Sequence, residues 1–172
     1  MRPQDVAVLL KIVSLGDLPW RYADLSQSLY ISQSEIAEAL NRCFLARLVD
    51  DSKRKIFRAS LQEFLVYGVK YVFPAQPGPV LRGIATAHSA SPLSESIGFQ
   101  EELYVWPHAE GSIRGQAIEP LYPRVIHAAQ KDPKLYELLA LLDAIRVGRA
   151  REYRLAVEML NQRIKEKAYA GL

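Results

Sequence analysis

Apolar side chains recur at helical spacing through the first 72 residues, with short polar turns between them. This pattern predicts helices over 3–15, 22–29, 33–46 and 59–72. The apolar stripe of the third of these helices is expected to face inward and to consist of Ile36, Leu40, Cys43 and Phe44.

Ser32 and Glu35 have the spacing of a capping box at the start of the third helix. In that arrangement the Ser32 hydroxyl accepts a hydrogen bond from the Glu35 amide, and the Glu35 carboxylate reaches back to the Ser32 amide. After this helix, 48–49 and 56–57 are short apolar pairs around a polar turn, which predicts a small β-hairpin.

The middle of the chain, 74–123, contains seven of the ten prolines and five of the nine glycines. Such a density of helix breakers excludes long helices, and the pattern favours short strands at 103–106 and 112–118. Tyr104 and Trp106 are large apolar anchors that disordered tails lack, so we expect an ordered, irregular arm.

Helical periodicity returns after residue 124. Helices are expected over 125–131, 133–147 and 149 to about 168, the second with a broad leucine-rich stripe. The predicted fold class is therefore mostly α with a small β wing, in three parts: 1–73, the arm 74–123, and the C-terminal helical hairpin 124–172.

Composition narrows the class of protein. The single cysteine, Cys43, excludes an internal disulfide and fits a reducing compartment, and a small core residue is the expected role of its side chain. No run of 18 apolar residues appears, so we expect a soluble, cytoplasmic protein without a membrane partner. His88, His108 and His127 lack the spacing of metal ligands, and no catalytic or cofactor-binding motif is present. We therefore expect no enzyme, no metal and no cofactor.

Charge is distributed unevenly along the chain, although the net formal charge is only +3. Residues 1–72 carry +2, residues 73–119 carry −3, and residues 120–172 carry +4. Five cations lie within twelve residues around the predicted hairpin, which is a candidate patch for phosphate; they are Arg47, Lys53, Arg54, Lys55 and Arg58.

The order of these elements (helix, helix, sharp turn, capped helix, basic hairpin) is that of a winged helix–turn–helix. Residues 22–36, YADLSQSLYISQSEI, resemble the core of MarR-like and related bacterial regulators, and the likeness covers roughly residues 3–72. Tyr30 departs from that pattern, because glycine usually stands at this place in the turn. Residues 135–151 are similar to an uncharacterised group of bacterial helix–turn–helix proteins.

The resemblance implies a transcriptional regulator that binds double-stranded DNA. The recognition helix, about 33–46, would enter the major groove, and the wing, 50–58, would contact phosphate or the minor groove. The expected DNA-binding residues are Gln33, Ser34, Glu38, Asn41, Arg42, Lys53, Arg54, Lys55 and Arg58. Gln33 or Asn41 would pair with adenine, and Arg42 with guanine or phosphate.

Regulators of this kind usually dimerise, so a homodimer through the C-terminal helices is expected. A second hypothesis remains open, in which the chain is an antitoxin-like or defence-system subunit. The winged helix and C-terminal helices would then hold a partner protein, and the two uses can coexist.

Overall fold

The computed structural model of this 172-residue chain describes residues 1–165. The N-terminal part contains α1 (Pro3–Leu15), α2 (Tyr22–Leu29) and α3 (Gln33–Leu45), which pack on one another. A hairpin loop follows α3, and a single antiparallel bridge between Val49 and Ile56 holds its two sides together. The expected hairpin is therefore present, but it is reduced to one bridge.

A continuous helical run follows the hairpin, as predicted for 59–72. It consists of α4 (Arg58–Glu63), one π-helical turn (Phe64–Gly68) and α5 (Val69–Val72). Leu61, Leu65 and Val69 face the core. Val72, the last residue of the run, is exposed.

The arm contains the only sheet in the part of the chain that the structure describes. Its strands are β1 (Val80–Ala85), β2 (Tyr104–Pro107) and β3 (Ile113–Ala117), and each pairs with both others. A 3₁₀ turn (Ala87–Ser89) and α6 (Leu93–Ile97) lie between β1 and β2. The strands expected at 103–106 and 112–118 are confirmed, whereas β1 was not predicted.

Glycine allows this small sheet to close. A Cβ at Gly83 would lie 2.1 Å from the carbonyl oxygen of Trp106, and one at Gly115 would lie 2.5 Å from that of Leu103. Both glycines belong to similar short sequences, Leu81–Ile84 and Ile113–Gln116, which pair with each other in β1 and β3. Gly83 and Gly115 are thus explained by the close approach of the strands.

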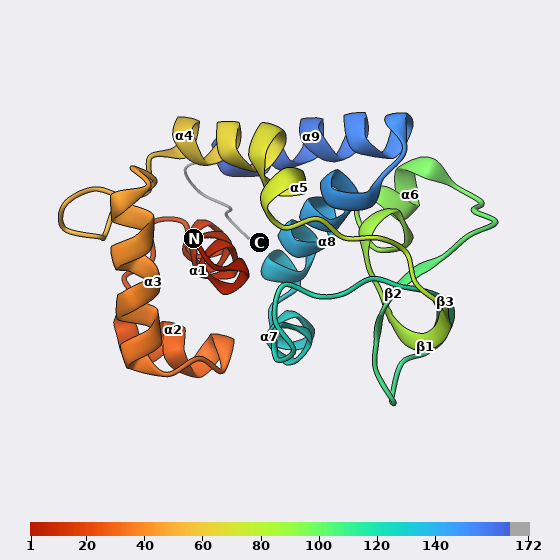
Figure 1. The fold of residues 1–172 in the computed structure, drawn as a ribbon, viewed down its shortest axis with the longest axis horizontal. Helices are drawn as coiled ribbons and strands as arrows, with labels where there is room; N and C mark the ends of the chain where they lie inside the picture. Colours follow the sequence, from red (N-terminus) through yellow and green to blue (C-terminus); the bar gives the residue numbers. More distant parts are fainter. Residues whose placement is uncertain (166–172) are drawn as a thin grey trace.

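The C-terminal part comprises α7 (Val125–Lys131), α8 (Pro133–Val147) and α9 (Ala150–Lys165), as predicted. The remainder of the last predicted helix, to about 168, lies outside the described residues. In Figure 1, α8 runs through the middle of the molecule, between the N-terminal helices and the arm. It packs on α1, α7, α9 and the 3₁₀ turn of the arm.

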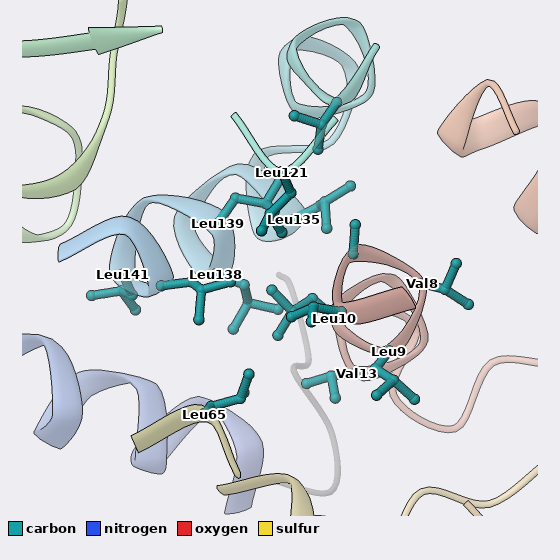
Figure 2. Close-up of a cluster of buried hydrophobic side chains, with 14 of the residues drawn as sticks. Val8, Leu9, Leu10, Val13, Leu65, Leu121, Leu135, Leu138, Leu139 and Leu141 are labelled. Atoms are coloured by element: carbon teal, nitrogen blue, oxygen red, sulfur yellow. The ribbon is translucent and has the colours of Figure 1, made fainter. Parts of the chain in front are cut away.

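The apolar side chains of α8 are buried inside the chain. Figure 2 shows Leu135, Leu138 and Leu139 of α8 beside Leu10 of α1, with Leu65 close by. All three parts of the sequence therefore contribute to one connected hydrophobic core. Within the chain α1, α7 and α9 already cover α8, and the homodimer through the C-terminal helices stays a prediction.

Candidate nucleic-acid interface

The helix α3 lies at one edge of the molecule, and the hairpin loop projects beside its C-terminal end (Figure 1). Its N-terminus is capped by Ser32, whose hydroxyl accepts a hydrogen bond from the Glu35 amide at 3.2 Å. Ile36 and Leu40 face the core, which leaves the opposite, polar side of α3 toward solvent.

Four of the predicted DNA-binding residues form this outer side. Gln33, Ser34 and Glu38 are exposed, and Asn41 is half-buried. The Asn41 amide donates a hydrogen bond to the Glu38 carboxylate at 3.4 Å. Amide, hydroxyl and carboxylate groups in a row on one helix face are the chemistry that reads base edges.

Arg42, also predicted to contact DNA, turns toward α1 instead. Its guanidinium donates to both carboxylate oxygens of the buried Asp5, at 2.8 and 2.7 Å, and to Glu35 at 2.6 Å. The hydrogen bonds that Arg42 donates to Asp5 raise the pKa of Arg42 further above its already high value. Arg42 therefore fastens α3 to α1 and does not extend the polar row on the outer side of α3.

Glu35 does not complete the expected capping box. Its carboxylate accepts hydrogen bonds from the side chains of Arg2 at 3.1 Å, Gln4 at 2.7 Å and Arg42 at 2.6 Å. The hydrogen bond from Arg42 is the main reason that the pKa of Glu35 lies below its usual value. The negative charge of Glu35 is thus compensated within the protein, which removes one source of repulsion toward phosphate.

The turn between α2 and α3 is held from outside the N-terminal part. Tyr30 has left-handed backbone angles, φ 57° and ψ 37°, the conformation that glycine adopts most readily. Its ring contacts the edge of the His127 ring, with 6.0 Å between centroids, and Lys131 lies over it. The Tyr122 hydroxyl also donates to the carbonyl of Leu29 at 2.9 Å. A tyrosine is therefore accommodated in place of glycine by contacts with the 122–131 segment.

The hairpin turn is organised by Asp50. Its carboxylate accepts hydrogen bonds from the backbone amides of Lys55 at 2.9 Å and Arg54 at 3.0 Å, and from the Ser52 hydroxyl at 2.7 Å. The first of these bonds does most to lower the pKa of Asp50. Lys53 has a positive φ of 59°, and its ammonium group donates to the side-chain oxygen of Asn41. The hairpin is thereby joined to the polar row of α3.

The remaining cations of the hairpin point elsewhere. Arg54 donates to the Trp20 carbonyl at 2.9 Å and stacks over the Trp20 and Tyr22 rings. Arg58 donates to the carbonyl of Ile164 at 2.6 Å, and Lys55 is exposed. The structure thus brings only Lys53 of the predicted wing cations onto α3.

Sequence analysis missed two apolar side chains on α3. Phe44 was expected in the buried stripe, but 38% of it is exposed, and Leu45 is 79% exposed. Both lie in the last turn of α3. Because the apolar spacing of Phe44 fits the stripe, nothing in the sequence distinguishes it from Cys43.

No cluster of three or more potential metal ligands occurs among the described residues. The buried Asp143 is part of a structural network: it accepts hydrogen bonds from Thr86, Trp106 and Arg146. Within the same part of the chain, no helix is both long and apolar enough to cross a lipid bilayer.

Comparison of the chain with protein-family models, with curated proteins and with solved structures finds no match.

Proposed function

We propose that the protein is a cytoplasmic, sequence-specific regulator that binds double-stranded DNA, with α3 in the major groove. The observation that carries the proposal is the polar row on the outer side of α3, which consists of Gln33, Ser34, Glu38 and Asn41. Lys53 of the hairpin donates a hydrogen bond to the Asn41 side chain and so adds a positive charge to this row. An exposed helix of this length fits the major groove, and its N-terminal residues then reach base edges.

The side chains of this row and Lys53 would contact different parts of the DNA. Gln33 and Asn41 have the amide groups that pair with adenine, and the Glu38 carboxylate can accept from the amino group of cytosine. Lys53 neutralises a neighbouring phosphate and adds affinity rather than sequence choice. Arg42 contributes indirectly, because its ion pair with Asp5 fixes the orientation of α3.

Fluorescence anisotropy tests the proposal directly. Labelled duplexes with the DNA upstream of the coding sequence and with random sequence are titrated at two salt concentrations. We expect salt-sensitive binding to both and a preference of about a thousandfold or more for the specific site. Gln33→Ala should weaken the preference, while Gln130→Ala, an exposed glutamine on α7, should leave it unchanged. Absence of binding at low salt by the folded protein refutes DNA binding.

A homodimer belongs to the same proposal, since one reading helix covers only one half-site. Because α8 is occupied within the chain, a second copy must use other surface. Sedimentation of the free protein and of its complex with a palindromic duplex measures the stoichiometry. One protein chain per duplex would contradict the proposed homodimer.

A second candidate function rests on the exposed apolar end of α3. Phe44 and Leu45 are unusual on a helix that reads DNA, and apolar side chains of this kind favour a protein partner. The antitoxin-like or defence-subunit hypothesis therefore stays a proposal beside the first. Leu45→Asp separates the two: it should abolish capture of a protein partner and leave the contacts of Gln33 with DNA intact.

A further inference from the structure

A cavity of about 800 Å³ lies between the end of α1, the loop 16–20 and the second side of the hairpin. Its volume is within the range of pockets that bind small molecules. Ile12, Trp20, Ile56 and Phe57 give it an apolar lining. The proposed function makes no use of this cavity.

Cations dominate the charged groups that line the cavity. The lining contains Arg54, Lys55 and Arg58 and one carboxylate, that of Asp17, so its formal charge is +2. Within residues 1–165, none of these three cations is in an ion pair. Positive charge without a carboxylate partner around an apolar pocket favours an anionic ligand.

Hydrogen-bond donors also remain available at this lining. Arg54 and Arg58 each use one terminal N–H group on a backbone carbonyl, whereas a guanidinium has five N–H donors in a planar fork. The hydroxyl of Ser60, which also lines the cavity, is a further donor. Several donors along one lining suit a phosphate group, which has more acceptor oxygens than a carboxylate.

We propose that this cavity binds a small phosphomonoester with an apolar group. A phosphomonoester carries a charge of about −1.5 to −2 at pH 7, which complements the +2 of the lining. The phosphate would contact Lys55 and the two arginines, and the apolar group would lie against Ile12, Ile56 and the exposed part of Trp20. Lys53 is not involved, because it reaches α3 instead.

Isothermal titration calorimetry with phenyl phosphate tests the site on the full chain without DNA. For a ligand of this size we expect one binding site with a Kd of about 1 mM or tighter. Inorganic phosphate lacks the apolar group and phenol lacks the charge, so each should bind at least about tenfold more weakly. Similar affinity for inorganic phosphate and phenyl phosphate would overturn the assignment of the apolar cavity.

Lys55→Glu is the decisive variant. The Lys55 side chain is exposed and makes no hydrogen bond within residues 1–165, so its replacement should leave the fold intact. The substitution should weaken the binding of phenyl phosphate at least about tenfold. The matched control is Arg124→Glu, which reverses an exposed cation outside the cavity and should leave the affinity unchanged. Equal affinities for the two variants, or no saturable binding to the wild type, would refute the site.

DNA is the other source of phosphate that must be distinguished. A random-sequence duplex is titrated into the wild type and Lys55→Glu, and we expect similar affinities for DNA. If Lys55→Glu loses DNA binding while the wild type does not bind phenyl phosphate, the cations of the cavity contact DNA phosphates and the inference fails. If the wild type binds phenyl phosphate but no DNA, the inference stands and the proposed regulator function fails.

Discussion

The buried carboxylate of Asp143 in α8 accepts a 2.7 Å hydrogen bond from the indole N–H of Trp106 in β2. The same oxygen accepts from the Thr86 hydroxyl, and the other oxygen accepts from Arg146 at 2.8 Å. Arg146 in turn donates to the carbonyls of Phe73 and Glu119. This network joins the arm to the central helix at the points where the arm enters and leaves its sheet.

Asp143→Asn should lower the free energy of unfolding by about 3–5 kcal/mol, because it leaves the buried Arg146 charge without its counter-ion. Thr86→Val removes one neutral donor and should cost about 1–3 kcal/mol. Urea unfolding followed by circular dichroism measures both values. The double variant Asp143→Asn with Arg146→Gln should be less destabilised than the sum of its single variants. Strict additivity would show that the two side chains do not act as a pair.

Acid should weaken the attachment of α3 to α1. Since the hydrogen bond from Arg42 lowers the pKa of Glu35 in the folded state, the ionised carboxylate stabilises the fold above its ordinary pKa of 4.5. That contribution is lost as the pH falls below 4.5 and through the lower folded-state value. Urea unfolding between pH 7 and pH 3 should therefore show a flatter dependence for Glu35→Gln than for the wild type. Parallel curves would mean that Glu35 does not contribute to acid sensitivity.

The thiol of Cys43 should be inert in the folded protein. Burial raises its pKa to about 12, so almost no thiolate is present at pH 8. Reaction with a disulfide reagent should be about a thousandfold slower in buffer than in denaturant, where the ordinary pKa returns. Absorbance of the released thiol follows the reaction. A fast native reaction would indicate an opening of α3 away from the core and would contradict a purely structural role for this residue.

Much of the helical framework could be predicted from sequence because its causes are local. Spacing, the Ser32 cap and Pro133 at the first turn of α8 locate the helices to within a few residues. Strand β1 was missed because it is defined by pairing with β2 and β3, which are distant in sequence. The burial of α8 could not be predicted for the same reason, since α1, one of the helices that cover it, lies more than a hundred residues earlier.

The candidate interface was predicted less completely than the fold. The polar residues of α3 are exposed or half-buried as their spacing implies, but sequence does not reveal which partner a charged side chain selects. Arg42 pairs with Asp5 across 37 positions, and Arg58 with the carbonyl of Ile164 across 106. The cations that are neighbours in the hairpin sequence therefore lie at different places in the structure. Lys53 contacts the outer side of α3, Lys55 lines the cavity, and Arg58 donates to the end of α9.

This division predicts different effects of the hairpin cations on DNA binding. Lys53→Ala should weaken binding to all duplexes and reduce the slope of log K against log salt by about 0.9, the loss of one phosphate contact. Arg58→Gln should leave the slope unchanged, because the Arg58 guanidinium is held by the end of α9. Anisotropy titrations at several salt concentrations give both slopes, with urea unfolding as a check that each variant is folded. Equal reductions for the two variants would place the whole basic hairpin on the duplex and contradict the separate roles that their contacts indicate.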